Sequence, residues 1–576
     1  MMQRMLAQLL VIILIAAFIE NAWSETFNSL PSSVMPSQVS KALRNSEPTS
    51  SEPHPIRALE ARSTETQTGL PKEDDKIKFK LNSIILVGNH VYSETVLQSL
   101  YQNSLHKEIS VSDLFAIVNR ITNFYRNNGY ILSRALLPPQ RAKEGIVRIQ
   151  IIEGYINNVE ISGNSYGAGK MVKRFGNKIK QCPPLRLNRM EKYLMLANDL
   201  PATDVKAVLS PSKNKVGAAD LTLVTDNKPV TAYLSYDNYG TRYIGPQQMT
   251  GNVGFNSFLT SGDSTQVTVT KTPKGGELTF MDINYNRPID EEGTRWAIGG
   301  TQVQTHPLFV LRPVEIDGLN DNYYTMWYFP VIHKESQSLI LRAGFNYLDT
   351  YVTILNSPLY TDHLRSLNIG GTYNFADRWY GANLVSVDVR QGLPIFGYTA
   401  DTNPNTATTS RPGGHGNYTK LVVVASRLQS IKGPLYLYGM IQGQEAASPL
   451  LAPEQFSIGG SQIGRGYDVA ELIGDKGAAS TLELRLDQNF NKPLLQKLQF
   501  YVFYDAGMIW NFKYIGGVPR KQSLTSTGLG IRFFASKYIS GNIMWTQPLT
   551  KTVAAQQLIG EGKRPRIFFS LVAAYQ

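Results

Sequence analysis

Cysteine is almost absent from this sequence. Cys182 is the only cysteine among 576 residues, so the chain cannot form an internal disulfide. An exported protein without paired cysteines needs another source of stability. A closed β-barrel is one such source, because it leaves no edge strand unpaired.

Long hydrophobic runs are also scarce, and this excludes a helical membrane protein, whose spans need about 20 apolar residues each. The one such run lies at the start of the chain. Residues 1–24 predict a signal peptide, with Arg4, an apolar stretch over 9–18, and small residues around a cleavage site at 22–24. A permanent anchor is the less favoured alternative, since the run is short and Glu20 interrupts it.

Metal-ligand spacing is lacking as well, so we expect no metal site and no cofactor. The histidines are scattered singly along the chain: His54, His90, His106, His306, His333, His363 and His415. The net charge is +12, yet no dense Lys/Arg run is present. Because export also argues against nucleic acid, the basic balance predicts a pore lining or contact with anionic outer-membrane lipids.

Two stretches resemble enzyme motifs, and neither holds. Residues 163–167 match Gly-x-Ser-x-Gly, but a module of about 70 residues is too small for the hydrolase fold that this motif requires. Residues 167–170 suggest a phosphate loop, but Asn164 and Met171 occupy the positions where that loop needs Gly and Ser or Thr. We therefore expect a protein that is not an enzyme.

The amino-terminal part predicts two small α/β modules behind a linker. Residues 25–77 contain a candidate plug helix at 37–44 and a Ser-, Pro-, Thr- and Glu-rich stretch at 46–73, which is typical of disorder. The first module, 78–154, and the second, 155–229, each begin with a strand that ends in Gly-Asn, at Gly88 and Gly163. The elements expected in them are strands at 83–87, 146–153, 159–162, 205–210 and 220–225, with helices at 96–101, 111–127 and 187–198.

Residues 230–576 predict a membrane β-barrel. Helical periodicity disappears, and alternating segments separated by turn residues take its place, for example at 339–347, 482–487, 500–507 and 567–575. A soluble β-sandwich also alternates. Charges such as Glu483, Arg485 and Asp487 on the face opposite the leucines instead favour a wet lumen. At about 20 residues per strand and connection, the segment holds about 16 antiparallel strands, enough to leave an aqueous bore.

One constellation interrupts the alternation. A Gly-rich stretch at 457–467 includes Gly464, Arg465, Gly466 and Tyr467, and lies within an expected pore-entering loop at about 454–480. Phe503, Asp505 and Gly507 share the lumen face of a later strand. A bidentate pair between Arg465 and Asp505 is expected to pin the loop inside the barrel, with Glu483 and Asp487 as competing partners.

These motifs resemble the Omp85 superfamily, and most closely its two-partner secretion (TpsB) transporters of the haemolysin and filamentous-haemagglutinin secretion type. Arg-Gly-Tyr in a Gly-rich loop, Phe-x-Asp-x-Gly on a late strand and two modules like POTRA domains carry the likeness. Further similar stretches are 137–140, 152–154, 196–201 and 236–240.

The resemblance implies that the POTRA modules bind the amino-terminal domain of a large, unfolded TpsA-type exoprotein in the periplasm. The exoprotein then crosses the outer-membrane barrel and folds outside. The resemblance also implies an amino-terminal helix that plugs the channel and an Arg-Gly-Tyr loop that lies in the pore and reaches toward the periplasm. An assembly factor that inserts other barrels is the alternative function, and a diffusion porin is a third. The cargo, its activation during secretion and the oligomeric state stay open.

Overall fold

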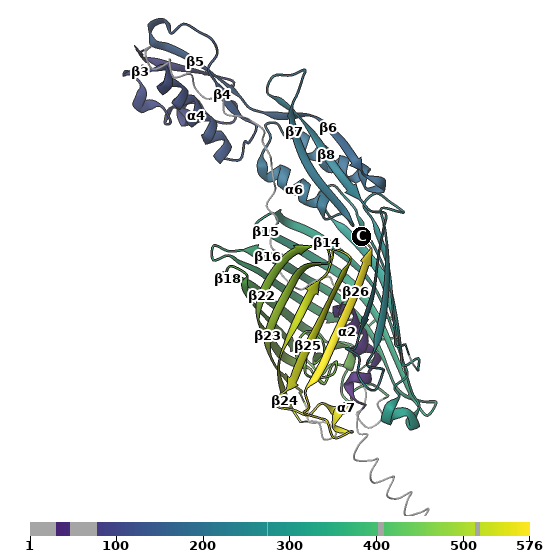
Figure 1. The fold of residues 1–576 in the computed structure, drawn as a ribbon. Coiled ribbons are helices and arrows are strands. Elements are labelled where there is room, and N and C mark those ends of the chain that lie inside the picture. The colour runs from purple at the N-terminus through teal and green to yellow at the C-terminus, as the bar shows by residue number, and fades with distance from the viewer. Residues whose placement is uncertain (1–29, 47–77, 274, 401–407, 513–518, 576) are drawn as a thin grey trace, which may run out of the picture.

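The computed structural model describes residues 30–46, 78–273, 275–400, 408–512 and 519–575. The predicted signal peptide and nearly all of the predicted linker lie outside the described residues. A large barrel occupies the carboxy-terminal part, and two small modules extend from one of its ends (Figure 1). Among the described residues, no helix is both long and apolar enough to cross a membrane.

Both small modules have one topology. Each contains a three-stranded sheet whose last strand is central. The first strand of that sheet lies parallel to it on one side, and the second strand pairs antiparallel on the other. The first module contains β1 (Lys78–Lys80), β2 (Ser83–Val87), α3 (Glu94–Gln98), β3 (Glu108–Ser110), α4 (Val111–Asn127), β4 (Arg134–Leu136) and β5 (Ile146–Ile152). The second contains β6 (Tyr155–Asn164), α5 (Gly169–Lys180), α6 (Leu187–Asn198), β7 (Thr203–Pro211) and β8 (Ala218–Asn227). In the first module, β1 and β3 form a separate antiparallel pair.

Helix α4 shows how the sequence forms these modules. Ser110 and Asp113 form a reciprocal capping box at its start, which satisfies two backbone N–H groups that the helix leaves free. Leu114, Val118 and Ile121 follow at spacings of three and four, and all three are buried in the core of the first module. The amphipathic pattern therefore fixes which face of the helix covers the sheet.

Sixteen antiparallel strands close the barrel, with β9 bonded to both β10 and β26. The strands are β9 (Val230–Asp237), β10 (Gln248–Asn256), β11 (Ser264–Lys271), β12 (Leu278–Pro288), β13 (Arg295–Thr305), β14 (Ile316–Lys334), β15 (Gln337–Ile354), β16 (Ser357–Ala376), β17 (Gly381–Gly392), β18 (Thr419–Lys432), β19 (Leu435–Ala446), β22 (Lys476–Lys492), β23 (Leu495–Trp510), β24 (Lys521–Phe534), β25 (Ile539–Pro548) and β26 (Arg566–Tyr575). On β22, Leu482 and Leu484 are exposed outside, whereas Glu483 and Arg485 are buried inside. The strand number and the apolar-out alternation confirm the predicted barrel.

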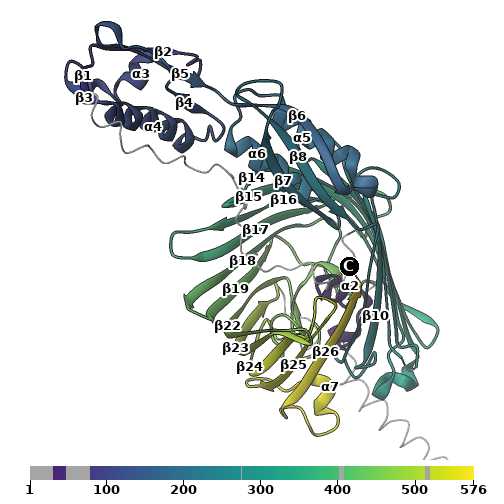
Figure 2. The ribbon, with the colours of Figure 1, turned by 45° about the horizontal axis from the view of Figure 1, so that its top comes forward.

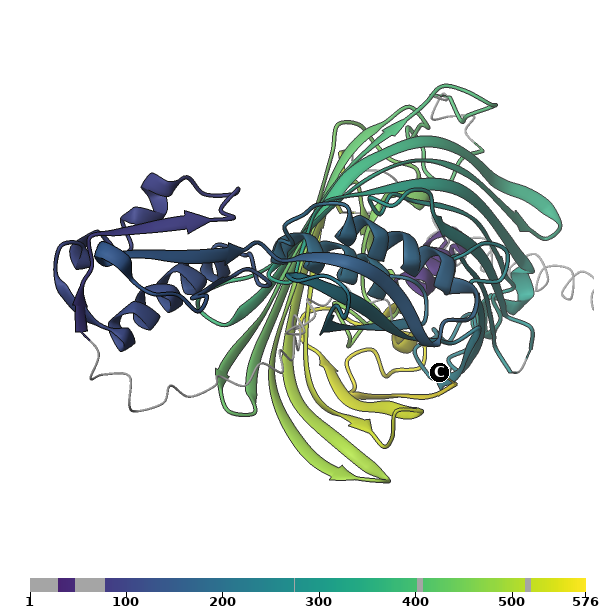
Figure 3. The same ribbon diagram turned by 90° about the horizontal axis from the view of Figure 1, so that it is seen from above.

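The second module is docked on the barrel. Seen along the barrel, its helices lie across the opening while the first module extends to one side (Figure 3). Lys178, Lys192 and Tyr193 all reach Glu292 on the turn between β12 and β13, at 3.2, 2.6 and 2.9 Å. The hydrogen bond from Lys192 is the main reason why the pKa of Glu292 falls to about 2. This end of the barrel is therefore held to the module by a charged contact.

The structure differs from the sequence-based expectations in two local places. Helix α5 was not expected, because its glycine-rich start was analysed only as a phosphate loop, although Met171, Phe175 and Ile179 follow helical spacing. The long loop was expected at about 454–480, but β22 already begins at Lys476. The loop also contains a short hairpin of β20 (Phe456–Ile458) and β21 (Leu472–Gly474), which was not predicted.

Candidate functional site in the barrel bore

The loop between β19 and β22 folds back into the barrel and carries the predicted motif. The β20–β21 hairpin packs on the inner wall, with Phe456, Ile458 and Leu472 in one buried cluster with Ile509 of β23. Gly459, Gly460 and Gly464 have positive φ values of 117°, 104° and 82°. Glycine adopts such angles without steric cost, so these glycines let the hairpin tip turn sharply against the wall.

Arg465 makes the central contact of this loop. Its side chain is 4% exposed and donates to Asp505 from Nε at 3.0 Å and from Nη2 at 2.7 Å. Nη2 also donates to Thr481 Oγ1 at 2.7 Å, and Nη1 pairs with Glu483. The guanidinium carbon lies 3.5 Å from the centre of the Phe503 ring. A planar fork of five donors suits this combination of carboxylates, a hydroxyl and a ring face.

Further charges close the cluster around Glu483. Arg485 Nε lies 2.7 Å and Arg532 Nη2 3.2 Å from Glu483 carboxylate oxygens. Three arginines thus face two carboxylates, those of Glu483 and Asp505. Buried charges are tolerated when they are paired and hydrogen-bonded, and this network meets that condition.

Of the other residues that the sequence predicted for this site, Tyr467, Gly466 and Gly507 lie beside the Arg465 cluster, and Asp487 lies away from it. Tyr467 donates to the Thr525 carbonyl oxygen at 3.1 Å and accepts from the backbone N–H of Lys551 at 3.1 Å. A Cβ atom on Gly466 would lie 3.0 Å from Ser526, and one on Gly507 would lie 2.6 Å from Ile458. Asp487 instead pairs with Lys497 at 2.6 Å, nearer the module end of the barrel, and is not a partner of Arg465.

The loop enters the barrel from the end opposite the modules. Thr481, which binds Arg465, lies 481 − 476 = 5 residues from the outer end of β22 and 492 − 481 = 11 residues from its inner end. The resemblance had implied a loop that reaches toward the periplasm. In this structure the arginine is instead held in the outer half of the bore.

Two further anchors of the loop were missed by sequence reasoning. Glu454 pairs with Lys420 at 2.7 Å and with Arg390 at 3.4 Å, on the wall strands β18 and β17. Asp475 pairs with Arg411 and accepts backbone N–H groups of Leu450 and Phe512 at 2.9 and 3.0 Å. The available signal was a carboxylate inside an apolar stretch, since residues 450–453 before Glu454 are Leu-Leu-Ala-Pro.

A helix lies beside this loop inside the barrel. Helix α2 (Pro36–Ser46) is enclosed between the barrel walls (Figure 2). Gln38 donates to the Ala452 carbonyl oxygen, and Lys41 Nζ donates to that of Gln455 at 2.9 Å. Ser32, in the turn before the helix, donates to the Ala470 carbonyl oxygen. The helix segment therefore contacts the loop just before the hairpin and again within the hairpin, close to β21.

Two family models match this chain, one over the barrel and one over the first module. Residues 218–533 match the model of the haemolysin secretion/activation protein family ShlB/FhaC/HecB, and residues 79–154 match the ShlB-type POTRA domain. The chain belongs to the ShlB/FhaC/HecB family. It is a two-partner secretion (TpsB) transporter of the outer membrane, as the sequence motifs predicted, and the end of the barrel that bears the POTRA domains faces the periplasm.

Two transporters match most of this chain in sequence, and one solved structure matches its fold. The heme/hemopexin transporter protein HuxB of Haemophilus influenzae is 25% identical over 496 residues, which is 83% of this chain and 85% of HuxB. The outer membrane transporter CdiB of Dickeya dadantii is 22% identical over 83% of this chain and 84% of CdiB. The solved structure of CdiB from Escherichia coli matches with a TM-score of 0.68, 18% identity, and coverage of 93% of this chain and 95% of that one.

The family is one of secretion channels, and it is not a known class of enzymes. Within the part of the chain that the structure describes, no group of three or more His, Cys, Asp or Glu side chains is placed to hold a metal ion. The buried carboxylates of Glu454, Glu483 and Asp505 are paired with lysine or arginine side chains. This arrangement can fix one conformation of the loop.

Proposed function

We propose that this transporter secretes one dedicated large exoprotein of the TpsA type and has no catalytic activity of its own. The observation that carries the proposal is that a hairpin and a helix outside the strand ladder, rather than strands of the barrel wall, occupy the bore. The β20–β21 hairpin and helix α2 both reach it from outside the strand ladder. A bore that is closed by elements which can leave is suited to passing a polypeptide.

The arginine cluster sets the resting position of the loop in this proposal. Removing the contacts of Arg465 would leave Asp505 buried and unpaired, which costs about 3–5 kcal/mol. The loop would therefore leave its position only when an arriving chain supplies compensating contacts. Gly464, Gly466 and Tyr467 on the loop, with Phe503 and Gly507 on the wall, provide the fit, while Glu483 and Arg485 hold the charge balance.

Helix α2 is proposed to be a plug that moves together with the loop. Its hydrogen bonds to residues 452 and 455 end on backbone oxygens of the loop, beside Glu454. Glu454 in turn is held to the wall by Lys420. Displacement of the loop would therefore remove polar contacts of the helix, and loss of the helix would expose the inner side of the loop.

The exoprotein is proposed to arrive through its amino-terminal domain at the POTRA sheets. Strands β2 and β4 are the edges of the first three-stranded sheet, and β6 and β7 are the edges of the second. An edge strand can accept an extended segment by main-chain hydrogen bonds, with little demand on its sequence. Folding outside the cell would then supply the drive. We expect outer-membrane lipids around the barrel and no role for nucleic acid.

Co-expression with a candidate exoprotein tests the function. We expect the exoprotein to reach the medium only with the intact chain, and to stay in the periplasm with a chain that lacks residues 78–154. The alternative, an assembly factor, rests on the likeness of the fold to BamA from Haemophilus ducreyi lacking POTRA domains 1–3, at a TM-score of 0.51, 14% identity, and coverage of 87% of this chain and 100% of that one. A general loss of outer-membrane proteins on deletion of this chain would favour that alternative.

A further inference from the structure

Helix α5 of the second POTRA domain presents one basic face. Its apolar side, which includes Met171, Val172 and Phe175, is buried in the domain core. Four exposed positions on the opposite side carry positive charge, and the helix contains no acidic residue. We call these residues the basic face: Lys170, Lys173, Arg174 and Lys180.

The amino-terminal part of the basic face is unfavourable for the helix itself. Lys170 lies in the first turn, where the helix dipole favours negative charge. Lys170 and Arg174 are separated by one turn, so their like charges repel. No side chain caps the start of this helix. Lys180 lies in the last turn, where positive charge is favourable, and Arg174 lies 4.0 Å from Glu291. Helix stability gives no such reason for Lys170, so an anionic partner outside the domain is the simpler explanation for the charge at the start of the helix.

An exposed apolar turn lies beside the start of the same helix. Phe258 and Leu259, on the turn between β10 and β11, are 76% and 66% exposed, and Tyr166 just before α5 is 67% exposed. Phe258, Leu259 and the neighbouring Tyr166 are together called the apolar turn, although Tyr166 lies on the segment before α5. The Met171 backbone N–H donates to Ser261 Oγ at 3.0 Å, so the turn and the helix are in direct contact.

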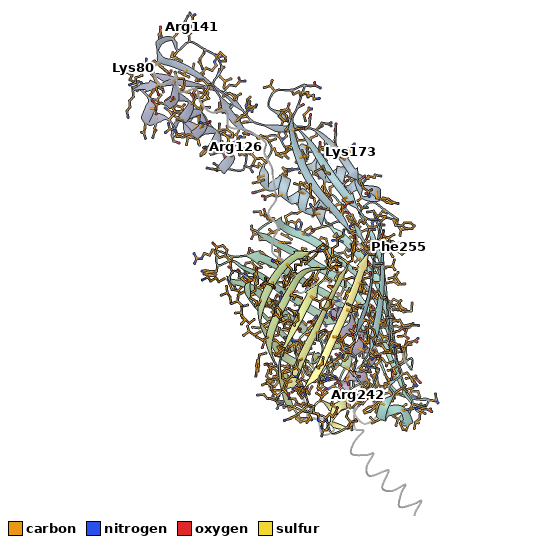
Figure 4. The ribbon with its side chains drawn as sticks, in the orientation of Figure 1. Lys80, Arg126, Arg141, Lys173, Arg242 and Phe255 are labelled. Atoms are coloured by element: carbon orange, nitrogen blue, oxygen red, sulfur yellow. The ribbon has the colours of Figure 1, made fainter. Side chains whose placement is uncertain are left out.

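The apolar turn continues the lipid-facing surface of the barrel. Phe255 points outward from the periplasmic end of β10 and is partly exposed. The centre of its ring lies 6.1 Å from that of Phe258. Lys173 and Phe255 lie along the same side of the molecule, where the second POTRA domain meets the barrel (Figure 4). Aromatic residues at this level of a barrel are typical of the membrane interface.

We propose that the basic face and the apolar turn together bind anionic phospholipid in the membrane leaflet that faces the periplasm. The apolar turn inserts among the lipids at the level where the strands end, and the basic face lies over the phosphate groups. Basic side chains near an anionic membrane surface are attracted to it, and aromatic side chains favour the interface. This contact fixes the second POTRA domain on the membrane as well as on the barrel rim.

An acidic segment of the exoprotein is the competing occupant. The position of Phe258 decides against it, because the turn extends a row of side chains that already faces lipid. A polypeptide bound there would have to displace lipid from Phe255 and Phe258. The lipid surface requires no such displacement.

Fluorescence quenching in liposomes tests the proposal on the full chain. In a Cys182→Ser background, Leu259→Cys is labelled with an environment-sensitive fluorophore. Nitroxide-bearing phosphatidylglycerol and nitroxide-bearing phosphatidylcholine then serve as alternative quenchers. We expect stronger quenching by phosphatidylglycerol, with a local enrichment of about fivefold, which is the effect of one lysine near an anionic surface.

Two sets of substitutions distinguish this contact from an effect of the protein's overall positive charge. Lys170→Gln, Lys173→Gln and Lys180→Gln together should remove the preference for phosphatidylglycerol. A control triple on the first POTRA domain, Lys80→Gln, Lys107→Gln and Arg141→Gln, should leave it intact. Equal quenching by the two lipids in the parent, an unquenched label, or a preference that survives the first triple overturns the proposal. So does a first triple that keeps the lipid preference but loses capture of the exoprotein in detergent, which would assign the face to the exoprotein.

Discussion

Arg465 donates to both carboxylate oxygens of Asp505, although 40 positions separate the two residues in the sequence. The same Asp505 Oδ2 atom also accepts the backbone N–H groups of Gly464 and Arg465, each at 3.0 Å. The carboxylate therefore fixes the backbone of the loop as well as its side chain. This wall residue on β23 thus joins Thr481 and Glu483 of β22 in holding a loop that begins at β19.

The first prediction concerns the shape of the arginine side chain. Arg465→Lys keeps the charge but loses the planar fork, so Asp505, Glu483 and Thr481 cannot all be satisfied. We expect a loss of about 1–3 kcal/mol of stability, together with reduced secretion. The measurement is the temperature at which the folded band is lost in gel electrophoresis. Arg564→Lys, on an exposed arginine, is the control and should behave like the parent.

The second prediction concerns exchange of the two charges. Combining Arg465→Asp with Asp505→Arg tests direct pairing, but the new aspartate would face Glu483, which now contacts Arg465. We therefore expect little recovery of secretion from the exchange alone. Adding Glu483→Gln removes that repulsion and should increase recovery. Glu483→Gln alone is the control for the contacts that Arg485 and Arg532 lose. If that single variant secretes normally and the triple still recovers no better than the double, the assigned role of Glu483 is wrong.

The third prediction concerns the space between the wall and the hairpin. A Cβ atom at Gly507 would lie 2.6 Å from the Ile458 side chain, whereas one at Gly443 would be 3.9 Å from its nearest neighbour. Gly507→Ala should therefore displace the hairpin and raise the ion conductance of the purified protein in planar bilayers. Gly443→Ala should leave the conductance unchanged. Equal conductance of both variants would contradict a hairpin that seals this part of the bore.

The fourth prediction concerns pH and the docking of the second POTRA domain. The pKa of Glu292 is lowered to about 2 from an unfolded value near 4.3. A lowered carboxyl pKa contributes stability that is fully present above the unfolded value and is lost as the pH falls toward 2. Spin labels on the domain and the barrel should thus show a broader distance distribution between pH 5 and pH 2.

A substitution at Glu292 should loosen the docking of the second POTRA domain already at neutral pH. Glu292→Gln should broaden the same distance distribution at pH 7, because the contacts with Lys178 and Lys192 lose their charge. Glu291→Gln is the control, since Glu291 lies 4.0 Å from the half-exposed Arg174. If the two variants behave alike, the docking does not depend on Glu292.

The sequence predicted those parts of the molecule whose pattern repeats. The alternation of Leu482 and Leu484 with Glu483 and Arg485 was sufficient for the barrel, because one face of each strand must meet lipid and the other the bore. The spacing of Leu114, Val118 and Ile121 was likewise sufficient for α4. These patterns follow from local geometry alone.

Contacts made by irregular segments were harder to predict. Arg465 and Asp505 could be matched because each lay in a short motif. Glu454 and Asp475 lie outside any motif, and their partners Lys420 and Arg411 are distant in sequence. Helix α5 was missed because a glycine-rich start concealed its amphipathic spacing. The inward turn of the long loop was predicted from the pairing of Arg465 with Asp505, but its depth in the bore and its β20–β21 hairpin depend on the whole barrel.

The central claim, that the exoprotein passes through the bore after the loop and helix move, is tested most directly by photo-crosslinking. A photoreactive amino acid replaces either Asn322, which faces the bore and is buried, or its neighbour Tyr323, which is exposed on the outer face. With an exoprotein stalled during secretion, the account predicts adducts from position 322 and none from 323. Adducts from position 323 alone would contradict it, because the exoprotein would then follow the outside of the barrel.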